Sequence, residues 1–401
     1  MTFETNKENI AVIGAGPVGM LAALSLAHRG YSVALIGPST YADELRTTAL
    51  MMPAIHMLQE LHIWNTIKNR AAALSLIRII DVTSRLVRAP NVNFCSAEIG
   101  EEAFGYNIPN LILNKALSDS IAHTSNIIRF FSSAKSFRHQ QNHTSITLTD
   151  NRVIHASLIV AADGRHSPTR AAAGIGVKQW NYPQTALVLN FSHDLPHNNI
   201  STEFHTENGP FTQVPLPENQ SSLVWVVNSS RAKELLSMGS KAIAKVIEDQ
   251  MQSMLGKLIV ETSVQTWPLL GMIPDCFAAN RTILVGESAH VLPPIGAQGL
   301  NLGFRDVQTL INILSKTTFD SNSKALTAHY NQCRKSDIFI RSGFVHALNY
   351  ALLSNMLPIH IMRNIGLELL RSCSPLRNLF MREGIHPGDG LKEIMQIFTT
   401  K

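Results

Sequence analysis

The segment that most constrains the fold is residues 9–37, where an apolar run leads directly into three closely spaced glycines. Residues 10–13 are mainly isoleucine and valine, which predicts a short strand buried on both faces. The glycines follow with G-x-G-x-x-G spacing at Gly14, Gly16 and Gly19. In a strand–turn–helix unit the first glycine permits a tight turn, the second admits a pyrophosphate, and the third lets helix and sheet pack closely. This context predicts a bound dinucleotide.

A helix and a second strand are predicted after these glycines. Pro17 lies near the first helical position, apolar residues recur at helical spacing over 21–27, and Gly30 stands where the helix ends. Residues 31–36 predict the second strand. Free N–H groups and the dipole at the start of this helix favour an anion. The alternative is a glycine turn that only packs the helix on the sheet.

The residue after the second strand departs from the usual dinucleotide-binding pattern. Gly37, followed by Pro38 and Ser39, stands where an Asp or Glu usually binds the adenosine ribose. We therefore expect the ribose to be held by backbone groups and water, or by a residue elsewhere in the chain.

A second stretch, residues 158–170, joins a strand end to residues that suit a ligand. The apolar strand ends in Asp163 and Gly164, and the glycine lets the backbone turn beside a ligand. Asp163 can accept hydrogen bonds from ribose or amide groups, and Ser167 is placed to cap the helix that contains Arg170. The alternative is a capped strand-to-helix turn with no ligand.

Residues 281–310 repeat this arrangement later in the chain. A strand over 282–285 ends in Gly286 and Glu287, and a loop rich in proline and glycine leads into a helix. A second glycine-rich helix start places another dipole and more free N–H groups against a ligand. His290 is either a general base or, the interpretation we favour, a structural histidine packed under the loop.

The middle of the chain is rich in predicted strands. Residues 72–96 and 183–227 contain short alternating runs separated by turns, and residues 232–255 predict a helix. Strands that do not alternate with helices predict an antiparallel sheet in a second domain. Arg46, in a polar run before the next helix, is either a donor to cofactor phosphate or ribose, or a solvated arginine.

Length, charge and cysteine spacing limit the classes of protein to which the chain can belong. With 401 residues, 45% of them hydrophobic and 16% charged, it is long enough for two or three folded domains. The net charge is +5 and no block of Lys and Arg occurs, so we do not expect nucleic-acid binding. The 4 cysteines are far apart, which predicts neither a zinc site nor a redox pair and fits a reducing compartment.

The two ends of the chain bear on localisation. The first residues are polar and acidic, unlike a secretory signal, and no stretch of about 20 uncharged apolar residues occurs, so we expect a cytoplasmic protein. Residues 327–401 predict apolar helices with scattered arginines. Such helices can lie on an anionic membrane surface, here the inner face of the membrane. The alternative is a helical cap on the core.

A resemblance to a known family rests on three motifs that occur in one order. They are GAGPVG from Gly14, DGRHSPTR from Asp163 and GESAHVLPPIGAQGLNLG from Gly286. With this set the chain resembles the single-component FAD-dependent aromatic hydroxylases that have the p-hydroxybenzoate hydroxylase fold. Within them it is most similar to the ring hydroxylases of ubiquinone biosynthesis, through RTTAL from Arg46, FGYNIPN from Phe104, PIGAQGLNLG and FMREGIHP.

The resemblance implies a mixed α/β fold. Its parts are a Rossmann-like FAD-binding domain, a substrate domain built on an antiparallel sheet, and a helical C-terminal region. The expected division is 1–71, 103–180 and 270–330 for the FAD-binding domain, 72–102 and 181–269 for the substrate domain, and 331–401 for the C-terminal helices.

The resemblance also implies a set of cofactor-binding residues. The first glycines hold the FAD pyrophosphate, Arg46 lies beside the FAD, and Asp163 and Gly164 serve both FAD and the nicotinamide donor. Glu287, where the family usually has Asp, binds the ribityl chain, and residues 293–301 line the isoalloxazine. Neither a metal ligand nor a catalytic side chain is named. The full set is Gly14, Gly16, Pro17, Val18, Gly19, Arg46, Asn110, Asp163, Gly164, Gly286, Glu287, Pro293, Gly296, Gln298, Gly299, Leu300 and Asn301.

The activity implied by the resemblance is hydroxylation of the aromatic ring of a polyprenylated phenol in ubiquinone biosynthesis. It proceeds through a C4a-hydroperoxide formed from reduced flavin and O2, with NAD(P)H as the expected electron donor. A long apolar tunnel, peripheral contact with the membrane and a complex of quinone-biosynthesis proteins are also expected. The alternatives are hydroxylation of a small soluble aromatic compound, and a non-catalytic protein that binds FAD or prenyl chains.

Overall fold

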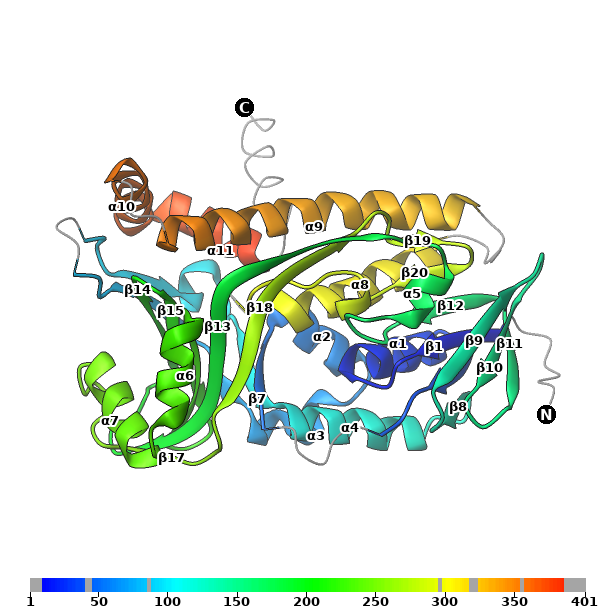
Figure 1. Ribbon diagram of the computed structural model, residues 1–401, viewed down its shortest axis with the longest axis horizontal. Helices are drawn as coiled ribbons and strands as arrows, with labels where there is room; N and C mark the ends of the chain where they lie inside the picture. Colours follow the sequence, from blue (N-terminus) through cyan, green and yellow to red (C-terminus); the bar gives the residue numbers. More distant parts are fainter. Residues whose placement is uncertain are drawn as a thin grey trace.

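The structure is a computed structural model in which two large sheets stand at opposite ends of the molecule (Figure 1). A long helix, α9, runs along the top of both, and long strands connect them (Figure 1). The described residues are 9–39, 45–84, 88–294, 298–316, 324–353 and 357–385.

A six-stranded sheet carries the three motifs. Its order is β19-β20-β12-β1-β2-β8, and all neighbours except β19 and β20 pair in parallel. The predicted first strand is confirmed as β1, which lies in the middle of this sheet, and this position explains its continuous apolar sequence. The strands are β1 Asn9–Ile13, β2 Ser32–Ile36, β8 Ile127–Phe130, β12 Leu158–Ala161, β19 Ala278–Ala279 and β20 Thr282–Leu284.

Both faces of this parallel sheet are covered. On one face Ile10 and Val12 pack with apolar residues of six helices, which are α1 Pro17–His28, α2 Met52–Glu60, α3 Trp64–Ile67, α4 Asn110–Ala122, α8 Gln298–Leu314 and α9 Lys324–Leu353. On the other face Ala11 and Ile13 pack against a three-stranded antiparallel sheet. That sheet consists of β9 Ala134–His139, β10 Thr144–Leu148 and β11 Val153–Ala156.

The larger sheet, at the left of Figure 1, has the order β17-β13-β16-β15-β14-β5-β6, with β18 paired to β13. The predicted antiparallel arrangement is confirmed except at β14 and β5, which run parallel. Helices α6 Ser229–Ser237 and α7 Ser240–Gln250 pack on one face. The strands are β5 Leu76–Asp81, β6 Val92–Cys95, β13 Val177–His193, β14 Ile200–Thr206, β15 Gly209–Leu216, β16 Gln220–Asn228, β17 Leu258–Val260 and β18 Gln265–Pro274.

Smaller elements join the two sheets and close the molecule. A three-stranded sheet, β3-β7-β4, lies between them, and α10 and α11 pack on β6 through Met381, Ile385 and their neighbours. The remaining elements are β3 Thr47–Met51, β4 Ala72–Ala73, β7 Gly105–Pro109, α3 Trp64–Ile67, α5 Pro168–Ala172, α10 Leu357–Ser372, α11 Ser374–Ile385, η1 Lys68–Arg70, η2 Ser96–Ile99 and η3 Gly286–Ser288.

Some predicted elements differ in detail from those observed. The helix predicted over 232–255 is two helices, because Met238 and Gly239 have extended backbone that ends α6 and begins α7. Pro358 and Pro375 lie in the first turns of α10 and α11, where proline is tolerated. The expected division into domains stays a prediction, and β13 runs unbroken through one of its boundaries.

Candidate cofactor site

The carboxyl ends of three parallel strands bring the three motifs together. β1 has β2 on one side and β12 on the other, so the strand order reverses at β1. In open α/β sheets, ligands bind at the carboxyl ends of the strands where the order reverses. Gly14 follows β1, Asp163 follows β12, and Gly286 follows β20. The Ala162 N–H donates to the Ile13 carbonyl at 2.7 Å, which holds the first two turns side by side.

The three glycines of the first motif have different surroundings, and the difference tests whether this turn fits a dinucleotide. A Cβ on Gly14 would lie 2.1 Å from the Ala162 carbonyl oxygen, and one on Gly19 would lie 2.0 Å from the Gly14 carbonyl oxygen. A Cβ on Gly16 would meet no heavy atom within 4 Å. Gly14 and Gly19 are therefore required by the packing of the protein itself. Gly16 faces open space, as a glycine that admits a pyrophosphate should.

The start of α1 suits an anion. Pro17 is the first residue of α1, Gly16 is its N-cap without a capping side chain, and its first turn has no acidic residue. The N–H groups of this turn therefore point to the ligand side with the positive end of the helix dipole. Val18 packs beneath the third motif, because a Cβ on Gly303 would lie 2.6 Å from its side chain.

In the second motif, the Asp163 carboxylate is bound within its own turn. It accepts hydrogen bonds from the Ser167 hydroxyl and, at 3.1 Å, from the Thr169 N–H. Ser167 accepts from the Arg170 N–H at 2.9 Å, so the predicted cap of α5 is confirmed. Gly164 has a φ of +82° and open space around its Cβ position. The turn therefore leaves backbone accessible beside the first motif.

Arg170 connects the second motif to the third. Its guanidinium donates to the Ser288 carbonyl at 2.9 Å, and the Ser288 hydroxyl donates to the Ala161 carbonyl at 2.6 Å. Burial lowers the pKa of this guanidinium below its ordinary value. Glu287 lies on the outside of the turn, with its side chain 53% exposed and 3.5 Å from Arg165. Its carboxylate is accessible to a ligand.

Asp306 holds the third motif from beneath, a role that our sequence reasoning missed. One carboxylate oxygen accepts from the Gly286 N–H and from His290 Nε2, both at 2.8 Å, and the other accepts from Arg334 Nε at 2.7 Å. All of these side chains are buried. His290 is therefore the structural histidine that we favoured. An acidic residue among the buried apolar positions of α8 is the signal that identifies Asp306.

Two asparagines of the expected set fix β3 beside this edge. The Asn301 carboxamide accepts from the Met51 N–H at 2.9 Å and donates to the Ala49 carbonyl at 2.8 Å. The Thr48 hydroxyl donates to Asn110 Oδ1 at 2.5 Å. Asn301 lies at the start of α8 and Asn110 at the start of α4, so two helix starts hold the same strand.

Arg46 connects β3 to the larger sheet. Its guanidinium carbon lies 4.7 Å from the centre of the Trp267 ring, which belongs to β18. Arg46 is half-buried, and both roles considered for it, a donor to the cofactor and a solvated arginine, stay predictions.

The loop that leads into α8 contains the last group of expected residues. Pro293 is buried, Leu300 is half-buried, and Gly299 is exposed with open space around its Cβ position. The Gln298 carboxamide oxygen accepts from Arg341 on α9 at 3.0 Å. Gly296 lies outside the described residues.

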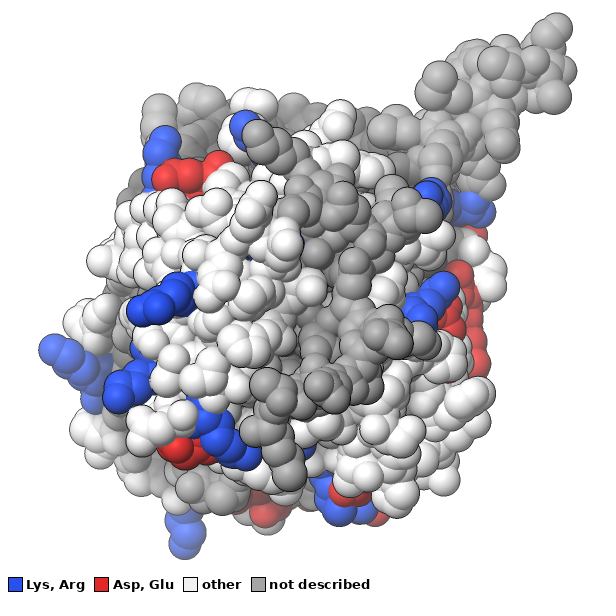
Figure 2. Space-filling model, turned by 90° about the vertical axis from the view of Figure 1, so that its right-hand side faces the viewer, with Lys and Arg blue, Asp and Glu red and all other residues white. Residues whose placement is uncertain are grey.

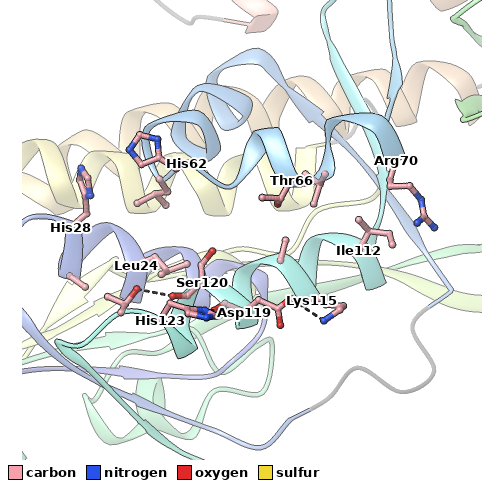
Figure 3. A pocket seen from close by; sticks show the side chains of 15 residues that line it. Leu24, His28, His62, Thr66, Arg70, Ile112, Lys115, Asp119, Ser120 and His123 are labelled. Carbon is pink, nitrogen blue, oxygen red and sulfur yellow. Dashed lines mark hydrogen bonds and ion pairs between the residues drawn. The ribbon is translucent and has the colours of Figure 1, made fainter.

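The cavity in Figure 3 is separate from this edge. It has a volume of about 690 Å³ and lies between the C-terminal half of α1, α3 and α4 (Figure 3). Leu24 and His28 line it from α1, at the opposite end of that helix from the glycine turn. Lys115 and Asp119 on α4 pair across one turn at 2.9 Å. We therefore do not assign this cavity to the cofactor.

The grouping of metal-binding side chains and of basic side chains bears on metal and nucleic-acid binding. Within the described ranges, no three His, Cys, Asp or Glu side chains are grouped so that they could hold a metal ion. On the face shown in Figure 2, Lys and Arg are scattered among uncharged residues rather than gathered into one area.

Comparison with known proteins gives the family. A family model described as an FAD binding domain matches residues 7–338, which include all three motifs. The chain is 28% identical over 388 residues to ubiquinone hydroxylase UbiL of Rhodospirillum rubrum, covering 94% of this chain and 89% of that protein. It is 28% identical over 369 residues to 3-demethoxyubiquinol 3-hydroxylase of Escherichia coli, covering 89% and 93%.

The fold comparison agrees with the sequence comparison. The crystal structure of p-nitrophenol 4-monooxygenase from Pseudomonas putida matches with a TM-score of 0.75 at 15% identity, covering 96% of this chain and 98% of that one. Among the described helices, none is both long and apolar enough to cross a membrane. The chain therefore belongs to the FAD binding domain family, and it is an FAD-dependent monooxygenase related to the hydroxylases of ubiquinone biosynthesis.

Proposed function

We propose that this monooxygenase hydroxylates the aromatic ring of a polyprenylated phenol, a precursor of ubiquinone. The observation that carries the proposal is the convergence of three glycine-bearing strand ends on one edge, beside β3, toward which the larger sheet turns a face that carries three valines. The names of the relatives, a ubiquinone hydroxylase and a 3-demethoxyubiquinol 3-hydroxylase, support this substrate class.

Hydrogen bonds identify which face of the larger sheet is turned toward the motifs. The Thr47 hydroxyl on β3 donates to Ser222 Oγ on β16 at 2.9 Å, so the Ser222 side of the sheet faces β3. By strand alternation and register, Val188, Val214 and Val224 lie on that same face, and each is half-exposed. We call this surface the inner face. Its branched apolar side chains suit the ring and prenyl chain of the substrate.

FAD, when bound, supplies the oxygen-transfer chemistry, and the residues of the chain bind and orient the reactants. The first glycine turn and α1 would hold the pyrophosphate, Glu287 would bind the ribityl chain, and Pro293 with residues 298–301 would line the isoalloxazine. Asp163 and Gly164 form the turn that would lie beside both the FAD and the nicotinamide donor, NAD(P)H. The route of oxygen transfer that the resemblance implies is part of this proposal.

The proposal includes contact with a membrane, where a polyprenylated substrate resides. Large apolar side chains are exposed on the C-terminal helices, with Met362 on α10 73% exposed and Phe339 on α9 74% exposed. Ile340, Ile365 and Leu369 are also exposed. Met362, Ile365 and Leu369 recur at helical spacing, so they lie on one face of α10, and an exposed apolar helix face supports contact with a membrane or a protein. We also expect this surface to bind other proteins of quinone biosynthesis in a complex.

Deletion of the gene tests the substrate class. We expect the deletion strain to lose ubiquinone and to accumulate a prenylated precursor that lacks one hydroxyl group, measured by mass spectrometry of extracted lipids. Unchanged ubiquinone favours a small soluble aromatic substrate instead. A purified protein that binds FAD but consumes no O2 with NAD(P)H and any phenol is the result expected from the non-catalytic alternative.

A further inference from the structure

The inner face carries a half-buried carboxylate beside a buried histidine, Glu203 and His205 on β14. They are two residues apart on one strand and therefore lie on the same face. His205 Nε2 lies 3.0 Å from Glu203 Oε1, and the side chains are 3% and 16% exposed. The Thr212 hydroxyl on β15 donates to the second oxygen of Glu203 at 3.4 Å.

Strand register places Glu203 on the wall that faces the cofactor edge. Thr212 pairs with Glu203 on one side and with Val224 on the other, so all three lie in one row across the sheet. Val224 is two residues from Ser222, which bonds to Thr47 on β3. The carboxylate is therefore in the row next to the contact between the two parts of the molecule.

On the other side of Glu203 in this row lies Ile79, whose contacts also lead toward β3. Ile79 on β5 pairs with Glu203 and packs in one cluster with Met51 and Met52. The Met51 N–H is bound by Asn301 at the start of α8, in the loop expected to line the isoalloxazine. Glu203 thus lies between Thr212 and Ile79, opposite the segment that leads to the flavin ring.

The other charged groups near the pair are engaged elsewhere. Asp81 is the register partner of His205 and forms a buried ion pair with Arg363 of α10. It also accepts from Thr83 at 2.7 Å. His205 Nδ1 is buried and has no hydrogen-bond partner among the described residues. A carboxylate is costly to bury unless it is paired or hydrogen-bonded, and His205 and Thr212 supply these partners to Glu203.

We propose that Glu203 is the catalytic base that accepts the phenolic proton of the substrate, and that His205 is a positioning residue that holds the carboxylate. This inference rests on the proposed function. A free phenol is a much weaker acid than a free carboxylic acid, so it does not transfer its proton to a carboxylate before the reaction begins. The phenolic hydroxyl becomes strongly acidic when the ring donates an electron pair to oxygen. Glu203 acts at that moment.

The step balances as follows. The ring carbon would form its bond to the terminal hydroxyl oxygen of the oxidant derived from O2 while the O–O bond of that oxidant breaks, and the second oxygen would leave with the bonding electron pair. The phenolic O–H bond breaks, and its proton moves to Glu203 Oε2. The ring C–H proton then leaves to water, and Glu203 returns its proton to the phenolic oxygen as the ring becomes aromatic again. The oxygen atom comes from O2, and NAD(P)H supplies the two electrons that reduce the second atom to water, as in the proposed function.

A chromophoric phenol tests the contact in the oxidised holoenzyme, without turnover. The probe is 2-geranyl-4-nitrophenol, whose neutral and ionised forms have different absorption spectra. The Glu203 carboxylate accepts a hydrogen bond from the neutral probe and repels the ionised one. The bound probe should therefore ionise at a pH about one unit higher in the wild type than in Glu203→Gln. Glu207→Gln, in the exposed turn directly after the same strand, is the matched control and should behave like the wild type.

The outcomes separate this inference from the proposed function. Equal ionisation of the probe in the wild type and Glu203→Gln overturns the role of Glu203. A wild type that does not bind the probe overturns the proposed substrate class. Glu203→Asp keeps the carboxylate, so the probe bound to it should ionise at the same high pH as in the wild type. If Glu203→Gln does not fold, ionisation of the probe at a clearly lower pH in Glu203→Asp is the contradicting result.

Turnover of 2-geranylphenol gives a second readout. We expect Glu203→Gln to form about 100-fold less hydroxylated product for each NAD(P)H oxidised, while its FAD content and its rate of anaerobic flavin reduction match the wild type. His205→Gln should lower product formation less and shift the pH profile. A wild-type ratio of product to donor in Glu203→Gln contradicts the proposal.

Discussion

Gly16 and Gly19 are three residues apart and have different reasons to be glycine, so their substitution separates cofactor binding from folding. Gly16→Ala adds a methyl group into open space. We expect it to change the free energy of unfolding of the apoprotein by less than about 0.5 kcal/mol. The same methyl group stands where the pyrophosphate approaches, so FAD affinity should fall at least about tenfold.

Gly19→Ala is the matched control, because its methyl group would lie 2.0 Å from the Gly14 carbonyl oxygen. It should destabilise the apoprotein by about 1–3 kcal/mol. Urea unfolding of the apoproteins and titration with FAD measure both effects. Wild-type FAD affinity in Gly16→Ala would contradict the assignment of the first motif.

Asp306 is the residue on which the third motif depends. Asp306→Ala removes the acceptor of the Gly286 N–H, of His290 and of Arg334 Nε in a buried site, while Arg334 keeps its ion pair with Asp337. Removing one partner of a buried ion pair costs about 3–5 kcal/mol, whereas replacing both by apolar residues costs less. We therefore expect the double variant Asp306→Ala with Arg334→Met to be more stable than Asp306→Ala in urea unfolding. Equal or lower stability of the double variant is the contradicting result.

Helices α8 and α9 are joined by a cluster of charges around Asp337. Burial alone would raise the pKa of the Asp337 carboxyl, but Arg334, Arg305 and Arg341 together lower it below its ordinary value. Burial lowers the pKa of the Arg305 guanidinium to about 10. Because this value is still well above 7, the group remains charged at neutral pH. The cluster therefore contributes stability only while the carboxylate is ionised.

The sign of the resulting pH dependence follows from the depressed pKa. The stabilisation is fully present above the unfolded pKa of about 4 and is lost as the pH falls through the folded value. Asp337→Asn should be less stable than the wild type at pH 7 and should lose less stability between pH 5 and pH 3. Urea unfolding across this range measures it, and parallel pH curves for the two proteins would refute the role of Asp337.

The elements that were predictable from the sequence depend on local patterns. The glycine spacing, Pro17 and the apolar periodicity predict β1, the turn and α1, and the Ser167 cap predicts α5. The placement of β12 next to β1, and of β20 next to β12, depends on pairing between segments far apart in the sequence. Only the family resemblance predicts that these segments come together. The partners of Asp306 come from distant segments, so its acidic side chain in an apolar helix stretch signals burial but not which groups it binds. Glu203 and His205 are two residues apart on one strand, but the face on which they lie depends on pairing with other strands.

The exposed apolar side chains of the C-terminal helices predict that the whole protein binds to a membrane surface. Replacing Met362, Ile365 and Leu369 with serine should abolish cosedimentation with vesicles of phosphatidylethanolamine and phosphatidylglycerol, without loss of FAD. The control replaces Phe131 and Ile259, which are also exposed but lie elsewhere, and it should still bind vesicles. Equal vesicle binding by the triple variant and the wild type would contradict membrane contact through α10.

The central claim is that three strand ends hold one FAD with its ring facing the inner face, where a phenol is oxygenated. The most direct test is to incubate the holoenzyme with NAD(P)H and 2-geranylphenol under ¹⁸O₂ and to analyse the product by mass spectrometry. We predict a ring-hydroxylated product that contains one atom of ¹⁸O from the gas and none from labelled water. Oxygen derived from water, or oxidation of NAD(P)H without any hydroxylated product, would contradict the account.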